Sequence, residues 1–73
     1  MDKRVNATKR DLLYDHIVDI AGRAAAQLQI AQDFSHLQDH EGFEHSISRF
    51  IGYAREVAET HREIRLLKKE EGN

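Results

Sequence analysis

Cysteine is absent from this chain, which excludes a disulfide, a thiolate metal site and a cysteine nucleophile. Proline is absent too, and only four of the 73 residues are glycine, so the residues that most often interrupt helices are scarce. No apolar run approaches the ~20 residues that cross a bilayer, and the first residues do not lead into a secretory apolar core. We therefore expect a mainly helical chain with no membrane partner and, by default, a cytoplasmic location.

An excess of one charge is also missing. Charged residues form 33% of the chain, yet they cancel to a formal net charge of −2, with a pI near 6.2. A protein dedicated to binding a phosphate backbone is normally far more basic. A domain of this size seldom obtains more than ~3–5 kcal/mol from its own core, and disulfides are excluded, so oligomerisation is the remaining way to enlarge that core.

Two seven-residue hydrophobic repeats are present, and they are out of phase with each other. Both advance by alternating steps of three and four residues, which places each repeat on one face of a helix. Continuing the first repeat would turn Glu41, His45 and Gly52 inward, so we predict that the first helix ends near residues 39–42. The first repeat is Leu13, Ile17, Ile20, Ala24, Gln27, Ala31, Phe34 and Gln38, and the second is Phe43, Ile47, Phe50, Ala54, Val57, His61, Ile64 and Lys68.

The predicted fold is all-α, a single domain over residues 1–73 built as an antiparallel helical hairpin. Folding at the predicted turn pairs Ala24 with Val57 and Ala31 with Phe50, which sets small side chains against large ones. Gln27 and His61 then form polar core layers, which in helical bundles select register or partner. The predicted segments are a polar arm over 1–7, a helix over 8–38 with Thr8 as its N-cap, a turn over 39–42, a helix over 43–70 and a tail over 71–73.

Each predicted helix carries a second apolar column beside the first. Tyr14, Ala21 and Leu28 form it on the first helix, and Ile51 and Ala58 form it on the second. Left uncovered, these columns would expose a larger apolar patch than soluble monomers usually tolerate. We therefore expect two hairpins to form a homodimeric four-helix bundle.

No catalytic constellation is recognisable, because neither a nucleophile beside a base nor a phosphate-binding glycine loop occurs. The sequence therefore predicts no enzyme, no cofactor and no catalytic residue. The favoured function is that of a small regulatory or adaptor protein that binds another protein through an apolar helix face. The predicted anchors are Tyr14, Leu28, Ile51 and Tyr53. If the dimer buries all four, the next choice is the turn around Phe43.

An alternative function is nucleic-acid binding, because the hairpin would bring basic residues from both ends of the chain together. In layout, with two long helices, a short turn and heptad layers of small and large residues, the chain resembles the Rop-type RNA-binding hairpin dimers. The resemblance implies RNA as the nucleic acid, but it is one of architecture and carries over no residue. The basic residues of this alternative are Arg4, Lys9, Arg10, Arg62, Arg65 and Lys69.

A third alternative is a metal-binding turn. His36 and His40 are four residues apart, as metal ligands on one helical face can be, and His45 lies close by with several carboxylates. Short motifs of this kind frequently occur without a metal. We favour solvated surface histidines and predict no metal ligand.

Overall fold

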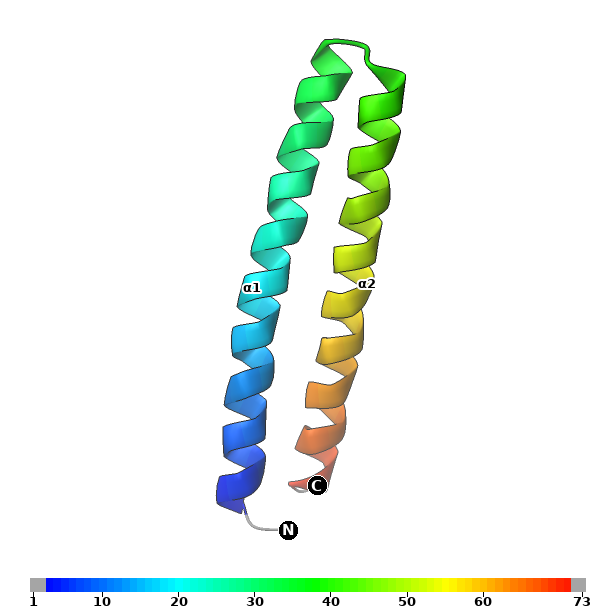
Figure 1. Ribbon diagram of the computed structural model, residues 1–73. Helices are drawn as coiled ribbons and strands as arrows, with labels where there is room; N and C mark the ends of the chain where they lie inside the picture. Colours follow the sequence, from blue (N-terminus) through cyan, green and yellow to red (C-terminus); the bar gives the residue numbers. More distant parts are fainter. Residues whose placement is uncertain (1–2, 72–73) are drawn as a thin grey trace.

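Two long helices form the molecule in the computed structural model, which describes residues 3–71, with side chains from residue 7 onward. Helix α1 spans Lys3–His36 and helix α2 spans His40–Glu70. They run antiparallel, with both chain ends at one end of a rod that measures 53 by 15 by 13 Å (Figure 1). No strand occurs within residues 3–71, so the prediction of an all-helical hairpin is confirmed. Over the same residues, neither helix combines the length and the apolarity that crossing a membrane requires.

The helix limits differ from the predicted ones at three places. Helix α1 already includes residues 3–7, so Thr8 lies inside it and is not its N-cap. The connection is residues 37–39 instead of 39–42, and α2 begins at His40 instead of residue 43. At the other end Glu71 is the C-cap of α2. Residues 1–2 of the predicted arm and 72–73 of the predicted tail lie outside the described part of the chain.

Backbone hydrogen bonds explain why the turn comes this early. Gln38 adopts a left-handed conformation with φ of 55°, and its N–H donates to the Ser35 carbonyl at 3.1 Å. The Asp39 N–H donates to the Phe34 carbonyl at 3.0 Å. This pair of bonds is the Schellman arrangement that ends helices, usually with glycine at the left-handed position. Here glutamine occupies that position, so the usual sequence signal is missing.

Asp39 starts the second helix directly after the first one ends. Its backbone is extended, and its side chain accepts a hydrogen bond from the Gly42 N–H at 3.0 Å. An aspartate in this N-cap role satisfies an amide that has no partner within the helix. Gly42 therefore belongs to the first turn of α2. A Cβ atom there would lie only 2.7 Å from Cγ of Phe34, so glycine permits the Phe34 ring to lie against the backbone of α2.

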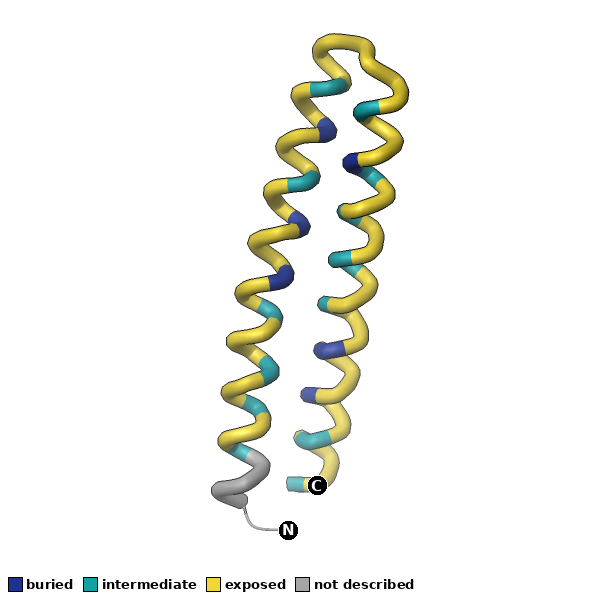
Figure 2. Tube along the Cα trace, in the orientation of Figure 1, coloured by how far each residue is buried: buried dark blue, intermediate teal, exposed yellow. Residues whose placement is uncertain are grey.

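The first hydrophobic repeat forms the inward stripe of α1, as predicted. Ile20, Ala24 and Ala31 are buried, and the other members from residue 13 to residue 34 are half-buried. The buried positions recur on the side of α1 that faces α2 (Figure 2). Only Gln38 departs from the repeat, because it lies in the turn and is exposed. Gln27 is half-buried, so it does contribute a polar layer between the helices.

The second repeat is only half correct, and His61 is the main error. Val57 and Ile64 do face α1, but His61 and Lys68 are exposed, and Thr60 and Leu67 take their places. Thr60 is only 5% exposed, and its hydroxyl donates to the Glu56 carbonyl at 2.9 Å. Because that bond satisfies the hydroxyl, threonine can be buried at little cost. The inward stripe of α2 contains Ser46, Phe50, Tyr53, Val57, Thr60, Ile64 and Leu67.

The earlier turn also changes which residues lie level with each other. Counted outward from residues 37–39, Ala31 is level with Ser46 instead of Phe50. Ala24 is likewise level with Tyr53 instead of Val57. Ala31 and Ser46 are 2% and 1% exposed, so the closest packing near the turn joins two small side chains. The predicted pairing was therefore wrong by about one helical turn.

Candidate functional site

The inward stripes divide the hairpin surface into two flanks of different chemistry. Residues seven apart on a helix follow one side of it, so each flank can be traced along both helices. His16 Nε2 lies 3.5 Å from Glu56 Oε1, which shows that their two columns share a flank. The columns on the other side of each inward stripe must then share the opposite flank. On α1 that opposite column contains Tyr14, and on α2 it contains Ile47.

The apolar flank, as we call this second side, is a continuous ladder of small and large apolar residues. Val18 is 72% exposed, Tyr14 53%, Leu28 48% and Ile51 43%. Within the single hairpin these large side chains are therefore far from fully covered. The apolar flank consists of Tyr14, Val18, Ala21, Ala25 and Leu28 on α1 and Ile47, Ile51, Ala54 and Ala58 on α2.

Three of the four predicted partner anchors, Tyr14, Leu28 and Ile51, lie on the apolar flank. The fourth, Tyr53, does not lie beside them. It is half-buried in the inward stripe of α2, level with Ala24, where the small alanine leaves room for its ring. The structure thus places three anchors along one flank and Tyr53 between the helices.

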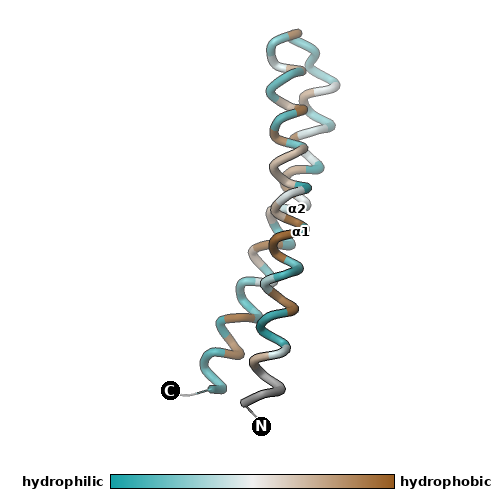
Figure 3. The backbone as a smooth tube through the Cα atoms, turned by 90° about the vertical axis from the view of Figure 1, so that its left-hand side faces the viewer, coloured by the Kyte–Doolittle hydropathy of each residue, from teal (hydrophilic) through white to brown (hydrophobic). Residues whose placement is uncertain are grey.

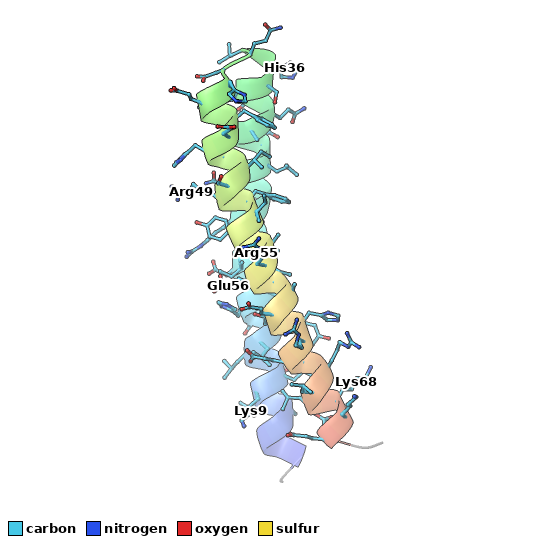
Figure 4. All side chains as sticks on the ribbon, turned by 90° about the vertical axis from the view of Figure 1, so that its right-hand side faces the viewer. Lys9, His36, Arg49, Arg55, Glu56 and Lys68 are labelled. Carbon is cyan, nitrogen blue, oxygen red and sulfur yellow. The ribbon has the colours of Figure 1, made fainter. Side chains whose placement is uncertain are left out.

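The charged flank is the opposite side of the hairpin. It carries Lys9, His16 and Arg23 on α1, and Arg49, Glu56, Glu63 and Glu70 on α2. Figure 4, in which α2 is in front, shows Lys9, Arg49 and Glu56 along one edge and Lys68 along the other. Arg23 Nη2 also lies 3.5 Å from Asp19 Oδ2 on this side. Ion pairs between exposed groups such as these contribute little, about 0–1 kcal/mol each.

A leucine groove interrupts the charged flank near the chain ends. It is a hollow of about 440 Å³ between the helices, open to solvent. Leu12 and Leu66 form its lips and are 64% and 56% exposed, whereas Leu13 and Leu67 are half-buried and form its floor. Hydrophobic positions continue along both helices to this end of the molecule (Figure 3). The charged residues that line the groove are Lys9, Glu63 and Glu70.

Sequence reasoning missed this groove, because Leu12 and Leu66 belong to neither heptad repeat. Each directly precedes a leucine of the inward stripe, so a pair of adjacent leucines occurs on each helix. In an antiparallel hairpin the pairs Leu12-Leu13 and Leu66-Leu67 are level with each other at the open end. That repeated pair was the signal from which the groove could have been found.

The basic residues of the nucleic-acid alternative do not form one surface. Arg10 Nη1 is 2.6 Å from both carboxylate oxygens of Glu71, which closes the open end of the hairpin. Lys9 lines the groove on the charged flank. The remaining described cations recur at i, i+3 and i+7 on one exposed face of α2, and the Arg4 side chain is outside the described part of the chain. These remaining cations are Arg62, Arg65 and Lys69, all exposed.

At the turn, a second hollow of about 280 Å³ is lined mainly by Phe34, Phe43 and polar residues. His40 Nε2 lies 3.2 Å from Glu44 Oε1, one helical turn further along α2. Across the described residues, no group of three or more His, Asp or Glu side chains is arranged to hold a metal ion. The three histidines near the turn are exposed.

Comparison with known proteins gives no match: no family model fits the chain, and neither the curated proteins nor the solved structures contain a significant relative.

Proposed function

We propose that this chain is a non-enzymatic regulatory or adaptor protein that acts through protein–protein contacts as a homodimer. In this proposal two hairpins pair through their apolar flanks and form a four-helix bundle. The observation that carries it is the exposure of four large apolar side chains, Tyr14, Val18, Leu28 and Ile51, along one flank. Full burial of such a side chain contributes roughly 1.5–3 kcal/mol, so covering several of them on each copy gives a strong drive to associate.

The distribution of side-chain size along the apolar flank supports pairing with another helix surface. Alanines occupy its middle, namely Ala21, Ala25, Ala54 and Ala58, whereas larger residues lie toward both ends. Small residues let helix backbones approach closely, and the larger ones can then interdigitate beyond them. A small chain gains core volume most readily in this way, because its own core remains narrow.

Sedimentation equilibrium of the Val18→Glu/Ile51→Glu double variant tests the dimer. Both side chains are exposed in the hairpin, so we expect retained helix content by circular dichroism and a change from dimer to monomer. Ser48→Glu is the matched control, because it adds the same charge at an exposed position away from the apolar flank. A wild-type protein that sediments as a folded monomer at micromolar concentration would contradict the proposal, as would a dimer unaffected by the double variant.

Nucleic-acid binding has weaker support as the function of this molecule. Arg10 is engaged by Glu71 and Lys9 lies at the groove on the charged flank, which leaves three cations together on one face of α2. Pull-down from a native lysate at low and high salt separates the two functions, since phosphate contacts weaken steeply with ionic strength and apolar docking does not. Recovery of RNA at low salt only, with no protein partner at either salt, would replace the adaptor proposal with the nucleic-acid one.

A further inference from the structure

The leucine groove lies on the flank that the proposed dimer leaves free. The apolar flank and the charged flank are on opposite sides of the inward stripes, as the pair of His16 and Glu56 shows. A dimer formed through the apolar flank would therefore cover Tyr14, Leu28 and Ile51 but not Leu12 or Leu66. An adaptor needs a surface for its partner besides the surface that joins its two copies. The groove is such a surface, and it rests on leucines that the hairpin itself does not cover.

The shape of the groove fits a row of apolar side chains. Two exposed leucines stand on either side of a floor made by Leu13 and Leu67, and the volume of about 440 Å³ is within the ~300–1,000 Å³ of ordinary binding pockets. The groove runs between the two antiparallel helices and is open to solvent. A helix that presents apolar residues at positions i, i+3, i+4 and i+7 fills grooves of this form.

The charge around the groove indicates the character of that helix. Of the three charged residues that line it, Glu63 and Glu70 are acidic and Lys9 is basic. Complementary charges at a rim speed the encounter and select the partner more than they raise the affinity. With two acidic residues to one basic residue around an apolar floor, the groove favours a partner whose apolar stripe is flanked by lysine or arginine.

We propose that the leucine groove binds a basic amphipathic helix of a partner protein. This inference rests on the proposed function, because it names the partner surface that an adaptor would need. Leu12 and Leu66 are the contacts that hold the apolar stripe of the partner helix. Glu63 and Glu70 select its charge. The Arg10–Glu71 ion pair does not line the groove, but it joins the two helices near it at 2.6 Å.

Fluorescence anisotropy with two labelled synthetic peptides tests the groove on the full chain. Both peptides have about 18 residues and the same leucines at helical spacing, with lysine at the other positions in one and glutamate in the second. We expect saturable binding of the lysine peptide, one for each chain, and at least tenfold weaker binding of the glutamate peptide. The Glu63→Lys/Glu70→Lys variant should reverse this preference. Equal binding of both peptides, or a preference that the variant leaves unchanged, would overturn the proposal.

A double variant and a matched control variant locate the peptide-binding site and show whether it differs from the dimer interface. Leu12→Gln/Leu66→Gln replaces exposed leucines with good helix formers of similar length, so we expect intact helix content, an unchanged dimer and at least a tenfold loss of peptide binding. Leu28→Gln makes the same exchange on the apolar flank and should leave peptide binding unchanged. Peptide binding that survives the double variant overturns the inference, and so does a dimer that dissociates in it. Peptide binding by a wild-type monomer would overturn the proposed dimer and leave the groove in place.

Discussion

The two ends of the hairpin are stabilised in different ways. At the turn, backbone and side-chain hydrogen bonds of Gln38 and Asp39 fix the path of the chain, and Ala31 and Ser46 are almost completely buried. At the open end a single described ion pair, Arg10 with Glu71, joins the helices, and two of the nearby leucines, Leu12 and Leu66, remain more than half exposed. The turn end is thus specified by local geometry, whereas the open end keeps apolar surface available for other molecules.

The two ends also differ in the size of the side chains between the helices. At the level of Ala31 and Ser46 small side chains fill the interface, although Leu37 in the turn itself is 75% exposed. Toward the chain ends the side chains are larger, and two helices cannot cover all of them. Four substitutions measure how the stability is divided between the ends, each by chemical denaturation at one fixed protein concentration, because association would change the apparent stability.

The largest effect is expected from Ile64→Ala, which tests whether the open half of the hairpin has a core. Ile64 is 4% exposed, so the substitution should lower the free energy of unfolding by about 2–4 kcal/mol. Leu66→Ala is the control at a neighbouring exposed position and should change it by no more than about 0.5 kcal/mol. Similar losses from both would mean that Leu66 is as well packed as Ile64, which would contradict the contrast between the ends.

Asp39→Ala should lower the free energy of unfolding by about 1 kcal/mol, because the Gly42 N–H would lose the carboxylate that accepts its hydrogen bond. Asp39→Asn should retain most of the stability, since an amide oxygen also caps helices well. Asp15→Ala, at an exposed position inside α1, removes the same charge without removing a cap. If Asp15→Ala lowers the free energy of unfolding as much as Asp39→Ala does, the Asp39 cap contributes nothing specific.

Gln38→Gly should change stability in the opposite direction and raise the free energy of unfolding by about 0.5–1 kcal/mol. Gln38 has φ of 55°, a conformation that strains side chains with a Cβ atom and suits glycine. The same exchange inside α1, Gln32→Gly, should instead lower stability by about 0.5–1 kcal/mol. A loss in both variants would show that the turn does not hold residue 38 in the left-handed region.

The smallest effect is expected from Glu71→Gln at the open end. The ion pair with Arg10 is partly exposed, with side-chain exposures of 33% for Arg10 and 24% for Glu71. Its loss should lower the free energy of unfolding by about 0.5 kcal/mol, and the difference from the wild type should shrink at high salt. A loss above about 2 kcal/mol would make the open end as strongly specified as the turn.

The fold could be predicted from the sequence wherever apolar spacing alone decides it. In α1 the first repeat is the longest stripe of regularly spaced apolar residues, and the structure confirms it as the inward stripe from Leu13 to Phe34. In α2 two stripes compete, one through Thr60 and one through His61. Spacing could not separate them, because the choice depends on a hydroxyl bond from Thr60 to a backbone carbonyl.

The turn was misplaced because its two signals are atypical. Glutamine stands where helix ends usually have glycine. The nearby Gly42 lies inside α2 instead, where its lack of a side chain leaves room for the Phe34 ring of α1. Of the candidate site, spacing alone placed Tyr14, Leu28 and Ile51 on one flank. It could not assign Tyr53, whose position depends on the register of the turn, and it did not identify Leu12 and Leu66, which become neighbours only in the folded hairpin.

Because the turn is short, we expect the contacts between the two helices to form in a fixed order during folding. Beside the turn, contacts join residues a few positions apart, such as Asp39 and Phe34, whereas the Arg10–Glu71 pair joins residues 61 positions apart. Each doubling of a closed loop costs only about 0.6 kcal/mol more chain entropy, so zippering from the turn proceeds by small steps. We therefore expect the open end to close last during folding and to open first during fluctuations, which would expose the leucine groove to the largest changes in shape.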